Sequence, residues 1–161
     1  MKKLDNFSNC LTILANADFK MAENNDIYRT GVIGQFNLTF ELAWKALQEI
    51  MRKHGVEDSS TGSPREILQL GYKFGFINDS ETWLLMLKKR NTSVHIYNKE
   101  EVDELILLIR DSFIPAFTAL KDLQRNWTKQ RVTGGNNEKK DNCASYSKYI
   151  FFSSSFTDKK Q

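Results

Sequence analysis

Hydrophobic residues recur at spacings of three and four along the first 127 residues, which is the period of amphipathic helices. The first series predicts a helix that ends near residues 21–24, with an apolar side made of Leu4, Phe7, Leu11 and Leu14. The second predicts a long helix from about Asp26 or Thr30 to His54. Its apolar side is unusually broad and comprises Val32, Ile33, Phe36, Phe40, Ala43, Trp44, Leu47, Ile50 and Met51. A surface this broad usually contacts more than one neighbour.

Helix-start signals predict where the next two helices begin. Ser63 and Glu66 can form a capping box around Pro64, a residue suited to the first helical position, which predicts a helix over about 64–74. Asp79 is a favourable N-cap for a helix that continues into a polar run at its C-terminal end. Both signals are local, because the residues involved lie within one turn.

The remaining pattern predicts an all-α fold. Asn98 caps a further helix, and Pro115 should break or kink the helical segment around it, because proline lacks an amide donor and clashes with the preceding turn. No strand-like alternation and no repeat occurs before residue 128. We therefore expect an up-and-down antiparallel bundle of four to five helices over residues 1–127. Residues 128–161 lose the helical period and are predicted to be a poorly ordered tail.

Composition and charge exclude several classes of protein. The net charge is +3, but residues 128–161 carry +4 and the preceding residues −1, so the basic balance predicts no nucleic-acid-binding face on the bundle. Two cysteines far apart and two histidines argue against a disulfide framework and a metal site, so we expect no metal and no cofactor. No stretch approaches ~18 consecutive apolar residues, which predicts a cytoplasmic protein without membrane contact.

The segment from Arg90 to Tyr97 is the one concentrated polar cluster at the end of a predicted helix. An arginine suits phosphate, and a histidine can transfer protons near neutral pH. Arg90 and His95 could therefore cleave RNA without a metal, His95 taking the 2′-hydroxyl proton and Arg90 neutralising charge on the phosphate. The alternative is that Arg90 complements the helix dipole and His95 is an ordinary loop residue.

The spacing between Arg90 and His95 limits how the two side chains can meet. On an α-helix, residues five apart lie about 140° apart, so Arg90 and His95 converge if the helix ends near Thr92 or Ser93. A two-fold dimer could instead bring the arginine of one chain to the histidine of the other.

Glu41 and Lys45 are four residues apart on the long predicted helix. They could form an ordinary surface ion pair worth about 0.3–0.5 kcal/mol. Their neighbours are among the most apolar of the chain, however, so Glu41 could instead orient Arg90.

Five segments together resemble the nucleotidyltransferase substrate-binding proteins, the HepT-like toxin branch of the HEPN superfamily. The resemblance spans about residues 1–127, and the segments are 31–36, 40–45, 63–65, 83–87 and 90–97. It is specific because the Arg-x-x-x-x-His-x-Tyr element of Arg90, His95 and Tyr97 accompanies the Glu-x-x-x-Lys element of the long helix.

The resemblance implies a dimeric helical bundle that acts as the toxin of a toxin–antitoxin pair, with a minimal nucleotidyltransferase as its partner and antitoxin. It further implies a metal-independent RNase with Arg90 and His95 as catalytic residues and Asn91 as the polar residue that follows the arginine. Tyr97 would be the residue to which the partner attaches AMP. The alternative for Tyr97 is that its ring packs over the end of the preceding helix. Two features depart from the family pattern: Lys88 and Lys89 stand where relatives carry acidic residues, and the tail has no recognised counterpart.

Three functions remain open from the sequence. The leading one is a HepT-like endoribonuclease toxin that acts on RNA. The second is a non-catalytic subunit that presents a substrate to the nucleotidyltransferase, and the third is a structural helical adaptor. The broad apolar side of the long helix also predicts a homodimer, whose interface includes this helix and the region near the helix that begins at Asp79.

Overall fold

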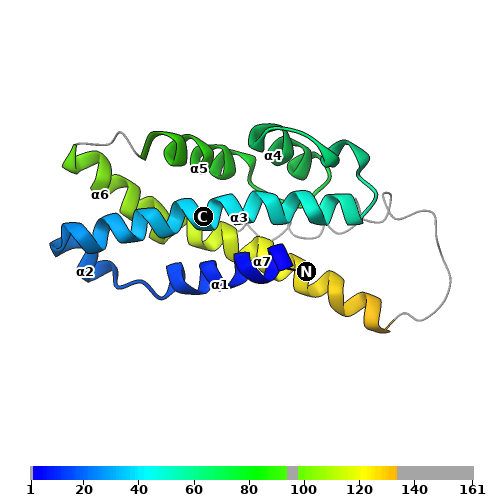
Figure 1. Cartoon of the computed structure of the whole chain (residues 1–161), viewed down its shortest axis with the longest axis horizontal. Coiled ribbons are helices and arrows are strands. Elements are labelled where there is room, and N and C mark those ends of the chain that lie inside the picture. Colours follow the sequence, from blue (N-terminus) through cyan, green and yellow to red (C-terminus); the bar gives the residue numbers. More distant parts are fainter. Residues whose placement is uncertain (1, 94–97, 134–161) are drawn as a thin grey trace, which may run out of the picture.

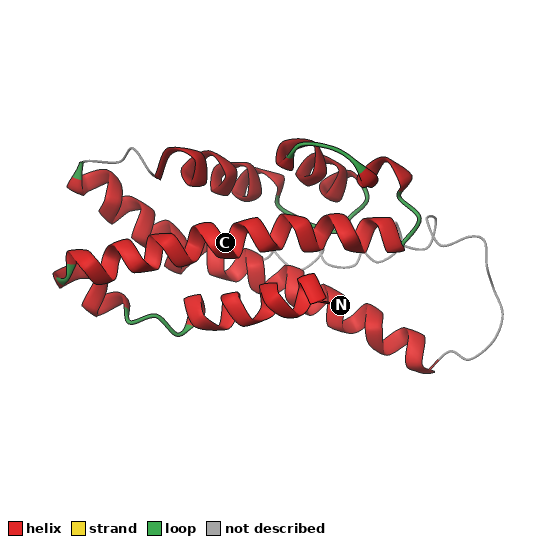
Figure 2. Ribbon diagram, in the orientation of Figure 1, coloured by secondary structure: helices red, strands yellow, loops and turns green. Residues whose placement is uncertain are grey.

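The computed structural model describes residues 2–93 and 98–133, with side chains up to residue 123. All the regular elements of these residues are helical, as Figure 2 shows, so the prediction of an all-α fold is confirmed for them. In chain order they are α1 (Lys2–Ala15), α2 (Phe19–Asn24), α3 (Asp26–Lys53), the 3₁₀ turn η1 (Glu57–Ser60), α4 (Pro64–Lys73), α5 (Ser80–Thr92), α6 (Lys99–Leu108), the π-helical turn η3 (Ile109–Phe113) and α7 (Ile114–Thr133).

The long helix α3 lies at the centre of the bundle. In Figure 1, α1 and α2 lie along one side of it and α4 and α5 along the other, while α6 and α7 form a helical path that crosses it obliquely. Helix α3 contacts α1, α2, α4, α5 and α6. The broad apolar side predicted for this segment is therefore used by several neighbours at once.

Aromatic rings join these helices in the core. Phe36 of α3 stacks on Phe113 with ring centroids 5.1 Å apart, and Phe117 packs edge-on against Trp83 of α5 at 5.4 Å. Phe7 of α1 packs against Phe117 from the other side, at 6.0 Å. All five side chains are almost completely buried, so the hydrophobic effect and ring packing hold α1, α3, α5 and α7 together.

The predicted helix starts are present. The Ser63 amide donates to Glu66 Oε2 at 2.7 Å, and the Glu66 amide donates back to Ser63 Oγ at 3.4 Å, which is the predicted capping box. The Asp79 side chain accepts the Thr82 amide at 3.0 Å and begins α5. Asn98 begins α6 in the same way.

The first predicted helix is wrong in one respect, because it is two helices. Helix α1 ends at Ala15, and the Asp18 carboxylate caps α2 by accepting the Met21 amide at 3.0 Å. The Asp18 amide donates to Tyr28 Oη at 2.8 Å, so a side chain of α3 stabilises the break. The apolar pattern of this segment continues without interruption, so it gave no indication of the contact between Asp18 and Tyr28.

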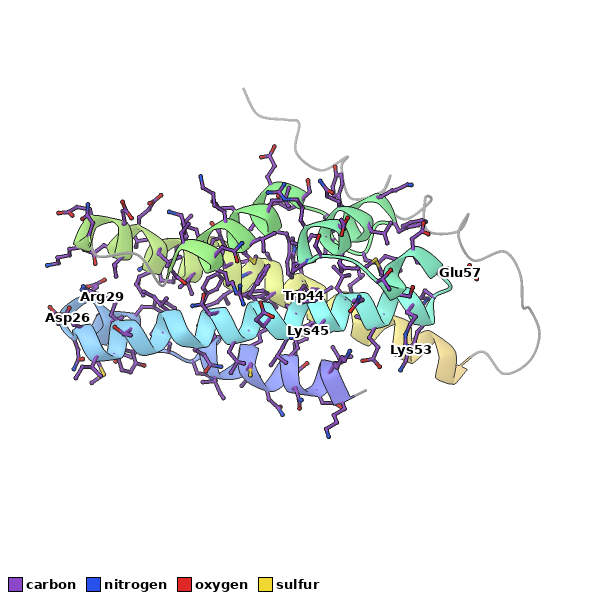
Figure 3. All side chains as sticks on the ribbon, turned by 45° about the horizontal axis from the view of Figure 1, so that its top comes forward. Asp26, Arg29, Trp44, Lys45, Lys53 and Glu57 are labelled. Carbon is purple, nitrogen blue, oxygen red and sulfur yellow. The ribbon has the colours of Figure 1, made fainter. Side chains whose placement is uncertain are left out.

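Arg29 connects the short helix α2 to the rest of the bundle. Its Nε donates to the Ala22 carbonyl at 2.8 Å and its Nη2 to the Glu23 carbonyl at 2.7 Å, at the C-terminal end of α2. Nη2 also lies 3.5 Å from the carboxylate of Asp103 in α6, and Nη1 donates to Asp26 at 3.2 Å. One buried guanidinium thus contacts α2, α3 and α6, at the end of α3 where Figure 3 labels Asp26 and Arg29.

Pro115 was expected to break or kink the helical segment around it, and of these two outcomes the break does not occur. The helical backbone passes from α6 through η3 into α7, and the Ile114 amide donates to the Ile109 carbonyl, five residues back. A turn that is wider than an α-turn relieves the clash between the proline ring and the preceding carbonyls. The proline therefore changes the helix type locally, and the helical backbone continues past it.

The C-terminal boundary stays a prediction. The helical backbone of α7 extends to Thr133, while residues 134–161 lie outside the described ranges. Among the helices that the structure describes, none has the length and apolar character needed to cross a membrane.

Candidate functional site

The candidate site lies where the C-terminal turn of α5 meets the middle of α3. Arg90 Nη2 lies 2.8 Å from Glu41 Oε1, so the predicted contact between the two residues is present. The side chain of Glu41 is 26% exposed and that of Arg90 39% exposed. The arginine is thus fixed by a carboxylate and remains partly accessible to a ligand from solvent.

The second oxygen of Glu41 binds two further groups of α3. Glu41 Oε2 lies 3.4 Å from Lys45 Nζ and accepts a hydrogen bond from Trp44 Nε1 at 3.3 Å. Lys45 Nζ also lies 5.5 Å from the centroid of the Trp44 ring. Figure 3 labels Trp44 and Lys45 near the middle of α3. Glu41 therefore bridges Arg90 and Lys45, and these three side chains carry a net charge of +1, which favours an anion.

Helix α5 ends where the convergence of Arg90 and His95 requires it. Its last residue is Thr92 and its C-cap is Ser93, so the chain leaves the helix within three residues of Arg90. Asn91 Oδ1 accepts a hydrogen bond from Arg90 Nη1 at 3.0 Å, which places the predicted supporting residue against the guanidinium. His95 and Tyr97 lie outside the described residues.

Sequence reasoning missed one contact of this site. Asn37 Nδ2 of α3 donates to Ser93 Oγ at 3.0 Å, and Ser93 Oγ lies 2.9 Å from the carbonyl oxygen of Arg90. A signal was present, because Asn37 precedes Glu41 by one helical turn and so shares its face of α3. Sequence alone did not say which segment this face would meet.

Two further polar contacts involve the helix that carries Arg90. Lys89 Nζ lies 2.9 Å from Glu104 Oε2 and joins α5 to α6. At the opposite end of α5, hydrogen bonds from Thr82 lower the pKa of the Asp79 carboxyl below its usual value. Helix α5 is therefore joined to α6 near Arg90, while its first turn is stabilised by its own cap.

The site consists of an arginine, a lysine, a carboxylate and two amide side chains, which suits phosphate binding and charge neutralisation. Across residues 2–93 and 98–133, no group of three or more described His, Cys, Asp and Glu side chains is arranged to hold a metal ion. The chemistry available from the described side chains is thus recognition of an anion by fixed cations.

A protein-family model described as "Nucleotidyltransferase substrate binding protein like" matches residues 2–125. The match includes every residue of the candidate site.

Two known proteins are similar to this chain. The probable ribonuclease HepT of Haemophilus influenzae is 27% identical over 104 residues, which are 63% of this chain and 71% of that protein. A solved structure of the tri-AMPylated Shewanella oneidensis HEPN toxin in complex with MNT antitoxin has a similar fold, with a TM-score of 0.63 and 17% identity. The superposition covers 78% of this chain and 95% of that one.

Proposed function

Because this chain belongs to the nucleotidyltransferase substrate binding protein-like family, we propose that it is the HEPN toxin of a toxin–antitoxin pair. In this proposal it is a metal-independent endoribonuclease of the cytoplasm, neutralised by a partner nucleotidyltransferase. The likeness to a probable ribonuclease HepT supports the activity, and the shared fold with a HEPN toxin supports the architecture. The observation that carries the proposal is the Arg90–Glu41 pair at the end of α5.

The proposed reaction uses two residues of the chain. His95 accepts the proton of an RNA 2′-hydroxyl, and the 2′-oxygen attacks the adjacent phosphorus. Arg90 binds the phosphate and neutralises the charge that develops on its oxygens. The bond from phosphorus to the 5′-oxygen breaks, and this leaving oxygen takes a proton from water while His95 returns its own to the solvent, so that a 2′,3′-cyclic phosphate and a 5′-hydroxyl result. Glu41 and Asn91 hold the guanidinium, and Lys45 adds a second positive charge beside it.

The activity is tested by expression and by cleavage. Inducible expression of the wild-type chain should arrest growth of a host, whereas the Arg90→Ala and His95→Ala variants should be tolerated. The purified protein should cleave RNA in the presence of EDTA, and each variant should lower the rate about a hundredfold or more. Cleavage that requires a divalent metal, or that survives His95→Ala, would contradict the proposal.

The family description also supports a second candidate, a non-catalytic subunit that presents a substrate to a nucleotidyltransferase. It predicts that wild type and His95→Ala are tolerated equally on expression. In that case the protein should bind the nucleotidyltransferase but should cleave no RNA.

The proposal extends to the control of the toxin. The solved HEPN toxin is described as AMPylated and in complex with MNT antitoxin, which supports a nucleotidyltransferase partner that transfers AMP to this chain. We assign the acceptor to Tyr97: its hydroxyl oxygen would attack the α-phosphate of ATP, with pyrophosphate as the leaving group. The added phosphodiester would bring a negative charge into the segment that carries His95, where it competes with RNA for Arg90.

Labelling with ATP, magnesium and the partner nucleotidyltransferase tests this assignment. Wild type should gain AMP and lose RNase activity, and Tyr97→Phe should gain none. The Tyr72→Phe variant is a suitable control, because Tyr72 is an exposed tyrosine of α4. Equal labelling of wild type and Tyr97→Phe would refute the assignment.

A further inference from the structure

Helix α3 contacts the end of α5 at two successive turns. Glu41 binds the guanidinium of Arg90, and Asn37, four residues earlier on the same face, binds Ser93. Asn37 and Ser93 are both partly buried, in contrast to the exposed Thr92 between Arg90 and the C-cap. The two contacts thus reach the same turn of α5 from one face of one helix.

The hydrogen bonds at Ser93 have a definite direction. Asn37 Nδ2 donates to Ser93 Oγ at 3.0 Å. The hydroxyl has one proton, and its nearer acceptor is the Arg90 carbonyl at 2.9 Å, compared with Asn37 Oδ1 at 3.3 Å. A chain of hydrogen bonds therefore runs from Asn37 through Ser93 to the backbone of Arg90.

These hydrogen bonds act on a carbonyl in the last turn of α5. The last four carbonyls of an α-helix have no amide donor within the helix, and Arg90 is two residues from the end of α5. The Ser93 hydroxyl donates to the Arg90 carbonyl, and Asn37 holds Ser93 in place. The backbone of Arg90 is consequently fixed to α3 independently of its side chain.

We propose that Asn37 and Ser93 are positioning residues for Arg90. Glu41 orients the guanidinium, and the Asn37–Ser93 pair fixes the position of the Arg90 backbone. The catalytic part of this inference rests on the proposed RNase function, since the reaction requires Arg90 at a defined distance from the phosphate. A displacement of about 1 Å can lower the rate of such a reaction about a hundredfold.

Nuclear magnetic resonance of the Arg90 side chain tests the positioning directly, without any activity. The Nε–Hε signal of Arg90 should shift in Asn37→Ala and in Ser93→Ala, and it should be retained in Ser93→Thr, which keeps the hydroxyl. The matched control is Thr92→Ala, since the Thr92 hydroxyl donates within α5 to the carbonyls of Lys88 and Lys89. The control should leave the Arg90 signal unchanged.

Kinetics tests the consequence for catalysis. Asn37→Ala and Ser93→Ala should each lower kcat for RNA cleavage about tenfold or more, with little change in KM, because the ground-state contacts of RNA remain. The double variant should be no slower than the slower single variant, since both remove one chain of hydrogen bonds. Ser93→Thr should restore the rate.

The outcomes separate the two proposals. An Arg90 signal that is unchanged in both alanine variants overturns the positioning inference, whether or not RNA is cleaved. A wild-type protein that cleaves no RNA overturns the proposed function, while the Arg90 signal still decides whether Asn37 and Ser93 position the arginine. A melting temperature equal to that of wild type in each variant establishes that the fold is retained.

Discussion

Arg29 shows how one side chain can join three helices. Its guanidinium is buried, and it donates to two carbonyls at the end of α2 while it lies next to carboxylates of α3 and α6. A buried cation is costly unless such partners surround it. Two of the four partners of Arg29 are backbone oxygens and a third is a carboxylate of the distant helix α6, which no sequence pattern identifies, and for this reason the residue could not be predicted.

Arg29→Met should lower the free energy of unfolding by about 2–4 kcal/mol, because the Ala22 and Glu23 carbonyls lose a charged donor and Asp103 loses its cation. Urea denaturation measures this change. The control is Arg110→Met, because Arg110 is exposed and binds the neighbouring Asp111. Removal of that surface pair should change the stability much less. A similar loss in both variants would contradict the role given to Arg29.

The residues of the candidate site were partly predictable. For Glu41 the sequence left two contacts open, an ordinary ion pair with Lys45 and an orienting contact with Arg90, and both are present. Asn37 was missed because its partner is the hydroxyl of a residue 56 positions away. The roles of His95 and Tyr97 stay predictions, since both lie outside the described residues.

Among the helices, the boundaries that depend on contacts within one turn were predicted, whereas those that depend on distant residues were not. The capping box at Ser63 and the cap at Asp79 involve residues within one turn, so the sequence contains all of their partners. The break before α2 depends on Tyr28, ten residues after Asp18. The wide turn before Pro115 follows from the proline itself, but the sequence did not say that the helical backbone would continue past it. A pattern of hydrophobic residues does not identify the contact between Asp18 and Tyr28.

The crossing of α3 and α4 depends on a glycine. A Cβ at Gly71 would lie 2.8 Å from Cδ2 of Leu47, whose side chain is completely buried. Gly71→Ala should therefore lower the free energy of unfolding by up to about 2 kcal/mol, which is the cost of overpacking less the gain in helix propensity. Gly31→Ala is the matched control, since a Cβ at Gly31 meets no atom within 4 Å. The free energy of unfolding of this control should rise by about 0.5–1 kcal/mol, because alanine has a higher helix propensity than glycine. Thermal denaturation of both variants measures the difference.

The cap of α5 makes stability depend on pH. Thr82 lowers the pKa of Asp79 in the folded chain, so the folded chain binds fewer protons than the unfolded one in mildly acidic solution. The stabilisation is present above the ordinary pKa of an aspartate and is lost as the pH falls through the lowered value. Asp79→Asn should therefore weaken the loss of stability between about pH 5 and pH 2. Melting temperatures of both proteins across this range test the sign, and parallel curves would contradict it.

At the scale of the molecule, the predicted homodimer remains to be tested. Leu38 of α3 is 49% exposed and is adjacent to Asn37, on the helix expected to supply the interface. Sedimentation at micromolar concentration should show a dimer, and Leu38→Glu should shift it towards the monomer by placing a charge in an apolar contact. Ile13→Glu is the control, because Ile13 of α1 is 61% exposed and outside the expected interface. A monomeric wild type that cleaves RNA would remove the dimer and a site shared between chains.

The central place of α3 has a consequence for the order of folding. Because α3 packs against five other helices, few long-range contacts can form before it does. We expect the transition state for folding to contain α3 docked on α1, which is separated from it in the chain only by the short helix α2, with α4 joining later. Phe36→Leu in α3 should then slow refolding, while Ile67→Val in α4 should mainly accelerate unfolding. Stopped-flow measurements in denaturant would distinguish this order from one in which both variants slow refolding equally.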